Sequence, residues 1–169
     1  KGKSIIVHVL NKAKKCGIGR VVVATEDIEI AKEVKKNKGL AILTSKKHKS
    51  GTDRIWEAYK KIKDNKIKYI INLQGDEPLI DIKDVKNLNK IVKKNKFGIA
   101  TLALKIKNNK VFKNKNIVKV ETKNKISKNI PQLAKNFTRV QNKRHGNFYQ
   151  HIGIYHYSVA MLKKFFNLK

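Results

Sequence analysis

The chain has 169 residues, and 40% of them are hydrophobic, so it can bury a core and is too apolar for wholesale disorder. Its one cysteine excludes an internal disulfide framework, and no apolar run approaches the ~18 residues that cross a membrane. The net charge of +29 suggests a polyanion binder, but 37 of the 41 basic residues are lysines spread along the chain. We therefore expect no specific nucleic-acid binding, no membrane association and a reducing, cytoplasmic location.

Helical and extended patterns alternate along the first half of the chain. Apolar residues at helical spacing between Ser4, a suitable N-cap, and Gly17, a suitable stop, predict the first helix. Thr52 is the expected N-cap of a later helix. The order expected here is a helix over 5–16, a strand over 21–24, a helix over 28–36, a strand over 40–43 and a helix over 53–62.

The second half continues the alternation and then becomes richer in strands. We expect a strand over 68–73, a helix over 84–94, strands over 99–106, 117–121 and 149–157, and a helix after Ser158. The polar stretch 127–147 is expected to be irregular. Strands that alternate with helices indicate the α/β class, with a Rossmann-like, mainly parallel sheet and helices on both faces. We expect one domain over residues 1–169, incomplete at its ends.

Three segments carry unusual chemistry at predicted strand ends, where open α/β sheets bind their ligands. Residues 48–54 combine hydroxyls, a glycine and an arginine at a helix N-terminus, which suits an anion or an ordinary capped loop. Residues 74–78 place an aspartate beside a glycine, which suits a Mg²⁺-nucleotide or a solvated turn. Residues 150–155 align His151, Gly153 and Tyr155 on one strand face, as a sugar site or a half-buried strand would.

Several common enzyme classes are excluded by missing motifs. The sequence has no G-x-G-x-x-G, no G-x-x-x-x-G-K-[ST] and no G-x-S-x-G. The absence of these motifs excludes the usual dehydrogenases, P-loop NTPases and α/β-hydrolases. It also has no H-x-x-x-H or C-x-x-C spacing for a transition-metal site.

Taken together, the three segments resemble the 3-deoxy-manno-octulosonate cytidylyltransferases, the CMP-Kdo synthetases of lipopolysaccharide synthesis. The pairing of H-x-S-G-T-D-R with Q-G-D-E-P is the most specific part of the resemblance. It extends through stretches 2–10, 21–27, 44–54, 72–78, 98–103, 118–120 and 151–155. The resemblance implies that the anomeric hydroxyl of Kdo attacks the α-phosphorus of CTP, which forms CMP-Kdo and releases pyrophosphate with the help of Mg²⁺.

The resemblance also implies roles for individual residues. Asp76 is the implied Mg²⁺ ligand, and Asp76 and Arg54 are the implied catalytic residues. Gln74, His151 and Tyr155 are implied to bind the sugar. The implied contacts of the nucleotide are Ser50, Gly51 and Thr52.

A further arginine is implied by a weaker match. Phe137-Thr138-Arg139 resembles a family F-S-R segment, which makes Arg139 an implied substrate-binding residue. The proline that usually follows is replaced here by Val140-Gln141-Asn142.

Two parts of the family pattern do not occur in the sequence. The P-A-R-x-x-S-x-R-L-P-x-K loop that grips the triphosphate is absent, as is a C-terminal part with a second Mg²⁺-binding aspartate. We therefore expect a fragment with little or no activity of its own, because such clamps supply large electrostatic terms in phosphoryl transfer.

Other interpretations stay open at this point. The sugar can be another acidic one, such as 8-amino-Kdo or a sialic acid. A basic nucleic-acid-binding module and a degenerate, non-catalytic relative are the alternatives from other classes. The resemblance suggests a homodimer.

Overall fold

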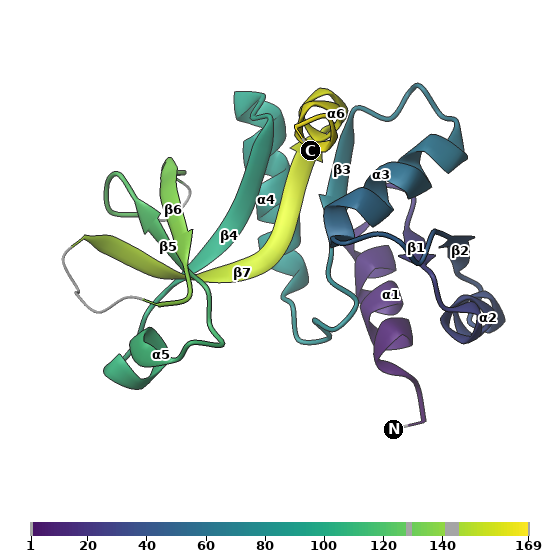
Figure 1. Ribbon diagram of the computed structural model, residues 1–169, viewed down its shortest axis with the longest axis horizontal. Helices are drawn as coiled ribbons and strands as arrows, with labels where there is room; N and C mark the ends of the chain where they lie inside the picture. The colour runs from purple at the N-terminus through teal and green to yellow at the C-terminus, as the bar shows by residue number, and fades with distance from the viewer. Residues whose placement is uncertain (1, 128–129, 141–145, 169) are drawn as a thin grey trace. The chain divides into compact units, whose positions relative to one another are not determined.

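The computed structural model describes residues 2–127, 130–140 and 146–168. The chain divides into two compact units, which are described separately here (Figure 1). The first unit comprises Lys1–Ala100 and Ile154–Lys169, and the second comprises Thr101–Gly153. The single domain expected from the sequence stays a prediction, but the structure distinguishes two bodies within that range.

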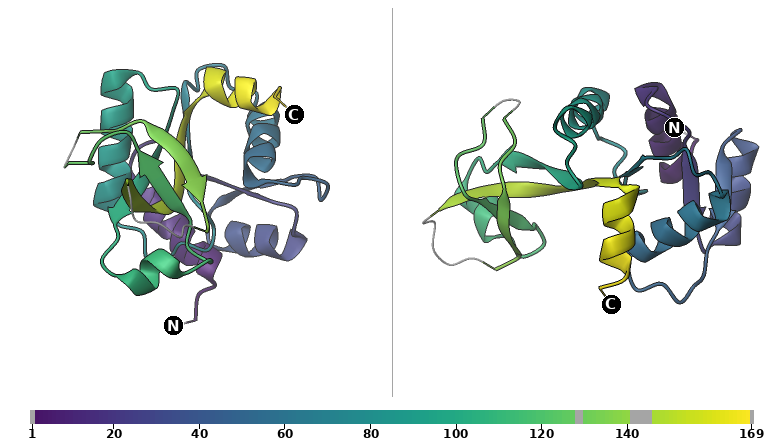
Figure 2. Two further views of the ribbon diagram at one scale, coloured as in Figure 1. Left: turned by 60° about the vertical axis from the view of Figure 1, so that its left-hand side comes forward. Right: turned by 90° about the horizontal axis from the view of Figure 1, so that it is seen from above.

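The first unit alternates helices with short strands, as predicted. Its elements are α1 (Ile5–Cys16), β1 (Val22–Thr25), α2 (Ile28–Lys36), β2 (Leu40–Leu43), α3 (Gly51–Ile62), β3 (Tyr69–Asn72), α4 (Ile82–Asn95), the start of β4 (Ile99–Lys105), the end of β7 (Asn147–Ser158) and α6 (Val159–Phe166). Helix α1 contacts α2 and α4, whereas α3 contacts α6. Figure 2 shows these two groups on opposite sides of the strands, so the expected helices on both faces are present.

Local signals explain most helix boundaries in this unit. Gly17 ends α1 in the left-handed conformation at φ 62°, and the Asp27 side chain accepts the Glu29 and Ile30 N–H groups at the start of α2. Helix α3 differs from the expectation, because Ser50 caps it and Thr52 lies inside its first turn. Both residues can cap a helix, and the hydrogen bond from Asp53 N–H goes to Ser50.

The predicted α/β class is confirmed, and strands β1 and β2 are parallel, joined by α2. The strands that pair with β7 do not follow the mainly parallel expectation. Strand β3 runs antiparallel to the end of β7, with Asn72 opposite Tyr155, and β4 also pairs with β7. Strand β7 joins them from far along the chain, which local pattern alone does not reveal.

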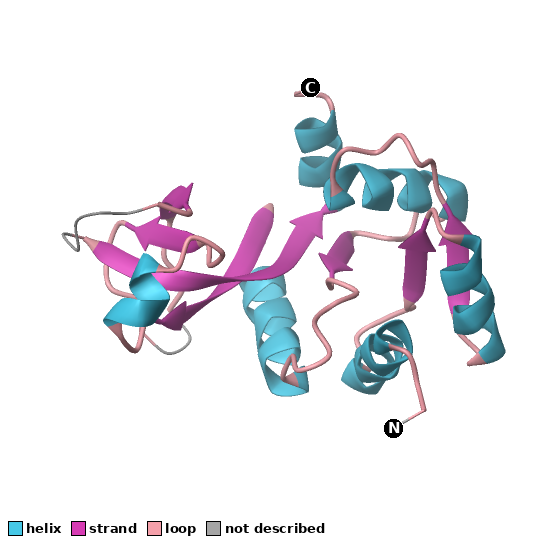
Figure 3. Cartoon of the chain, turned by 60° about the horizontal axis from the view of Figure 1, so that its bottom comes forward, coloured by secondary structure: helices cyan, strands magenta, loops and turns pink. Residues whose placement is uncertain are grey.

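The second unit is built on antiparallel strands. It holds the rest of β4 and β7 with α5 (Asn109–Lys113), β5 (Lys119–Thr122) and β6 (Ala134–Thr138). Strand β5 pairs antiparallel with both β6 and β7 (Figure 3). Strand β6 lies inside the stretch expected to be irregular, and α5 was not expected. The sequence of β6, Ala-Lys-Asn-Phe-Thr, is mostly exposed and has little apolar alternation, so its pairing depends on β5.

A buried histidine gives the first unit a predictable response to acid. His156 is fully buried in β7, where its Nε2 lies 3.1 Å from Asn89 Oδ1 and its ring meets Tyr69 edge-on. Burial, with a contribution from the charge of Lys93, lowers the pKa of His156 to about 4. The fold therefore disfavours the protonated ring.

This shift predicts that the free energy of unfolding falls as pH drops from about 6.5 toward 4. The unfolded chain binds a proton in that window and the folded chain does not, so the loss approaches about 3 kcal/mol. Urea unfolding at pH 7.5 and pH 4.5 measures it, and His156→Gln should weaken the dependence. Equal pH dependence in parent and variant would show that another group is responsible.

Candidate functional site

The start of α3 carries the three residues predicted to contact a nucleotide. Ser50 is the N-cap, and Gly51 and Thr52 are the first two helical residues. The Ser50 hydroxyl donates to Asp53 Oδ2 at 2.8 Å and accepts the Asp53 N–H at 3.3 Å. The backbone N–H groups of this first turn point out of the helix end and favour an anion there.

The predicted catalytic residue Arg54 is held at the carboxyl ends of two strands. Its guanidinium forms an ion pair with Glu26, which follows β1, and donates to Thr44 Oγ1, which follows β2, at 2.7 Å. Thr44 is buried, and the Arg54 side chain is 21% exposed. These contacts tie α3 to the strand ends. The catalytic role of Arg54 stays a prediction.

Glu57, which sequence reasoning missed, organises the loop before α3. Its carboxylate accepts the Ser45 N–H at 3.0 Å, contacts His48 and pairs with Lys61 at 2.7 Å. Hydrogen bonds from Lys61, from the Ser45 backbone and from His48, in that order, lower the pKa of Glu57 to about 2. The i,i+4 spacing to Lys61 is visible in the sequence, but the contacts to the loop depend on how it folds back.

We expect Glu57→Gln to loosen this loop and to change its response to acid. The depressed pKa stabilises the fold above about pH 4.5, and this contribution is lost as pH falls toward 2. The melting temperature of Glu57→Gln should therefore be lower than that of the parent at pH 6, with a smaller further fall below pH 4.5. Glu29→Gln, at an exposed ion pair with Lys32, is the matched control. Identical acid profiles for Glu57→Gln and the parent would contradict the assignment.

The segment after β3 forms a tight turn that presents Asp76. The Glu77 N–H donates to Gln74 O at 3.2 Å, and Gly75 and Asp76 are the exposed central residues. A Cβ at Gly75 would stand 3.2 Å from Ile6 Cδ1, so the turn lies against the start of α1. Within the described part of the chain no ion pair is recorded for Asp76, despite the large excess of lysines.

The first predicted segment approaches the strand that leads into the second, within the first unit. A Cβ at Gly51 would stand 4.0 Å from Nδ2 of Asn72, the last residue of β3. The end of β3 therefore adjoins the N-terminus of α3, and the turn that carries Asp76 begins two residues later. The N-terminus of α3 and the strand that leads into the Asp76 turn are therefore near neighbours.

Tyr155 joins the same edge of the first unit. It lies opposite Asn72 in the β3–β7 pairing, and its ring stacks on Tyr157 at 5.8 Å. Burial raises the pKa of Tyr155 and of Tyr157, so both phenols are protonated near neutral pH. The Tyr157 hydroxyl lies 3.5 Å from Thr52 Oγ1, a contact that no sequence pattern predicts.

His151 and Arg139, two predicted substrate residues, lie together in the second unit. The His151 ring is met edge-on by Phe137 at 5.2 Å, two residues before Arg139. Thr101 Oγ1 donates to Ile152 O at 3.0 Å and lies 2.9 Å from His151 Nε2. With the hydroxyl proton directed to Ile152, the His151 ring donates from Nε2. Burial lowers the pKa of His151, which favours the neutral ring.

The described residues contain no group of three or more His, Cys, Asp or Glu side chains that could hold a metal ion. They fit a cation that needs few protein ligands. Mg²⁺ commonly takes one or two carboxylates and completes its shell with water and substrate phosphates. The exposed carboxylate of Asp76, in the turn after β3, fits that requirement.

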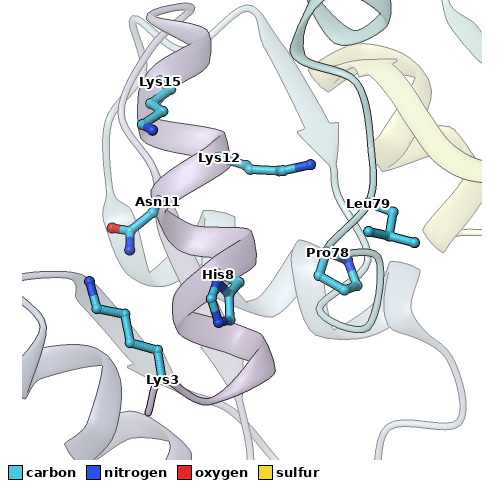
Figure 4. A pocket seen from close by; sticks show the side chains of 7 residues that line it. All are labelled: Lys3, His8, Asn11, Lys12, Lys15, Pro78 and Leu79. Atoms are coloured by element: carbon cyan, nitrogen blue, oxygen red, sulfur yellow. The ribbon is translucent and has the colours of Figure 1, made fainter. Parts of the chain in front are cut away.

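A basic pocket lies beside the Asp76 turn (Figure 4). Its volume is about 490 Å³. Its lining comes from the residues before α1, from one face of α1 and from the residues after the turn: Lys3, His8, Asn11, Lys12, Lys15, Pro78 and Leu79. Lys12 Nζ donates to Ile80 O at 2.9 Å and so fastens this stretch to α1.

Among the helices of the described residues, none has the length and apolar character that a membrane span requires.

An α/β fold with a helix N-terminus and an aspartate after the carboxyl ends of its strands is an arrangement in which such proteins bind ligands. A model of the cytidylyltransferase family matches residues 1–169, and the chain belongs to this family.

The chain is similar to curated proteins named 3-deoxy-manno-octulosonate cytidylyltransferase. It is 39% identical over 171 residues to that of Elusimicrobium minutum, covering 99% of this chain and 69% of the relative. It is 38% identical over 169 residues to that of Wigglesworthia glossinidia brevipalpis, covering 96% and 68%. A solved structure of CMP:2-keto-3-deoxy-manno-octonic acid synthetase complexed with CTP matches with a TM-score of 0.85 and 32% identity, covering 99% of this chain and 68% of that one.

Proposed function

We propose that the protein activates Kdo for lipopolysaccharide synthesis by transferring the CMP group of CTP to it, with release of pyrophosphate. The observation that carries the proposal is the close approach of the Gly51 end of α3 to the Asn72 end of β3, which brings segment 48–54 near the strand that leads into segment 74–78. The similarity to proteins named for this reaction supports the same substrates.

The chemistry needs no covalent enzyme intermediate. The anomeric oxygen of the sugar forms a bond to the α-phosphorus, the bond from that phosphorus to the β-phosphate oxygen breaks, and the hydroxyl proton passes to solvent. The protein contributes by holding the nucleophile in line and by offsetting the developing charge. In this account Ser50, Gly51 and Thr52 border the nucleotide, and their first-turn N–H groups face its negative charge.

The carboxylate of Asp76 would hold Mg²⁺ together with phosphate oxygens of CTP. Bound there, Mg²⁺ supplies Lewis-acid stabilisation of the charge that develops on the phosphates. Gln74, Tyr155, His151 and Arg139 are the residues that we propose to bind the sugar. Arg139 offers a guanidinium to the sugar carboxylate, and the neutral His151 ring offers hydrogen bonds to a hydroxyl.

The experiment that tests the proposal measures pyrophosphate release by the full-length protein with Mg²⁺ and each nucleotide and sugar in turn. We expect CTP with Kdo to react fastest, ahead of UTP or ATP and ahead of 8-amino-Kdo or a sialic acid. Faster release with another acidic sugar would replace Kdo in the proposal. No release with any sugar, together with tight DNA binding near physiological salt, would favour the nucleic-acid-binding alternative.

Mg²⁺ dependence, cytoplasmic location and a homodimer stay predictions of this proposal. We also propose that the 169 residues by themselves have little activity, and the same assay on this chain alone tests that expectation.

A further inference from the structure

The second unit contains a charged side chain that the proposed mechanism does not use. Lys119 lies in β5 and is 0% exposed, which is rare for a lysine. Its Nζ donates to Asn114 O at 2.6 Å and to Arg139 O at 2.9 Å. Burial and the nearby Arg139 charge both lower the pKa of Lys119. A buried charge is costly unless hydrogen bonds compensate it, so these two contacts are what make the position tolerable.

The two carbonyls belong to segments that meet at Arg139. Asn114 opens the turn that leads from α5 into β5, and Arg139 directly follows β6. The Arg139 guanidinium in turn donates from Nη1 to Asn116 O, in the same turn, at 3.0 Å. Lys119 therefore fixes the backbone of Arg139 against the turn that also receives the Arg139 side chain.

The same strand connects Arg139 with His151. In the pairing of β5 with its neighbours, Lys119 lies opposite Thr138 on one side and Gln150 on the other. The His151 N–H donates to Val118 O at 2.9 Å. Lys119 thus lies in β5, between β6 and β7. Arg139 directly follows β6, and His151 lies in β7.

We propose that Lys119 is a positioning residue, which sets Arg139 for the carboxylate of the acidic sugar. The inference rests on the proposed function and deepens it. We expect exposed lysines not to position Arg139 in this way, because the positioning depends on the two hydrogen bonds that Lys119 makes to the Asn114 and Arg139 carbonyls. Lys119→Met nearly keeps the length and removes the ammonium group, so the Arg139 carbonyl loses its hydrogen bond to Nζ and the Asn114 carbonyl keeps only the one from the Ile117 N–H.

The test is steady-state kinetics of the full-length protein, with each substrate varied in turn. Lys119→Met should raise the KM for Kdo by about ten-fold and leave the KM for CTP within about two-fold of the parent. Lys135→Met, at an exposed lysine on β6, is the matched control and should change neither constant. If Lys119→Met does not fold, Lys119→Gln provides the alternative variant. Its side-chain amide keeps an N–H donor group and should give a smaller rise in the KM for Kdo.

A double-mutant cycle separates positioning from general support of the fold. If Lys119 acts through Arg139, Lys119→Met should add no further rise in the KM for Kdo when Arg139 is already alanine. Equal rises in both KM values, or full additivity with Arg139→Ala, would overturn the proposal. Failure of the proposed function is a separate result, since the parent protein would then form no CMP-Kdo.

Discussion

Replacing Asp76 with Asn is expected to lower the turnover of the full-length protein about a hundred- to a thousand-fold. The carboxylate lies exposed at the centre of the turn after β3, and the last residue of β3 adjoins the N-terminus of α3. An amide retains the shape but loses the charge that holds a divalent cation, and one electrostatic contact of this kind is worth about two to three orders of magnitude in rate. The concentration of Mg²⁺ needed for half-maximal rate should rise as well.

The control for this prediction is Asp84→Asn. Asp84 is an exposed aspartate in the first turn of α4, so its removal tests the loss of one negative charge without the turn geometry. Because Asp76 makes no recorded ion pair within the described residues, Asp76→Asn should melt at the temperature of the parent. Near-normal turnover with an unchanged Mg²⁺ requirement would remove Asp76 from the metal site.

Replacing His151 with Ala is expected to raise the KM for the acidic sugar about ten- to a hundred-fold. This is the usual loss for a hydrogen bond that involves a charged ligand, about 1.5–3 kcal/mol. The KM for CTP should change little, and turnover should fall through poorer alignment of the attacking hydroxyl. Kinetics with each substrate varied in turn, with a melting curve for the variant, measure the effect.

Thr101→Val provides a graded companion to this variant. It removes the hydroxyl that lies 2.9 Å from His151 Nε2 but leaves the ring in place, so we expect a smaller rise in the same KM. A purely structural His151 would instead lower the melting temperature and impair both substrates alike. That pattern would falsify the assignment of His151 to the sugar site.

The parts of the fold that the sequence predicts well are those determined by neighbouring residues. The β1–α2–β2 unit follows from short apolar runs, an Asp27 cap and the parallel crossover rule. Strand β6 escapes prediction because its polar residues gain their strand conformation from β5. The insertion of β7 beside β3 is a contact between residues more than 80 positions apart, and periodicity carries no information about it.

The candidate site likewise contains some residues that local sequence order singles out and others that only folding brings together. The segments that hold Ser50, Gly51 and Asp76 are singled out by the rule that ligands bind at strand ends, because that rule uses only local order. The roles of these residues come from the family resemblance and stay predictions. Glu57 and Thr101 act through side chains or backbone groups that reach them by folding, and Lys119 is a lysine among 37 in the sequence. Burial distinguishes Lys119 from the other lysines that the structure describes, and burial is a property of the folded chain.

The most direct test of the account follows the phosphorus atoms of CTP during the reaction. Phosphorus NMR of the full-length protein with CTP, Mg²⁺ and Kdo distinguishes attack at the α-phosphorus from attack at the γ-phosphorus. We expect the triphosphate signals to be replaced by one phosphodiester signal, from CMP-Kdo, and by pyrophosphate in equal amount. Release of inorganic phosphate with CDP, or an unchanged CTP spectrum when Kdo is present, would contradict the claim that this protein transfers CMP to an acidic sugar.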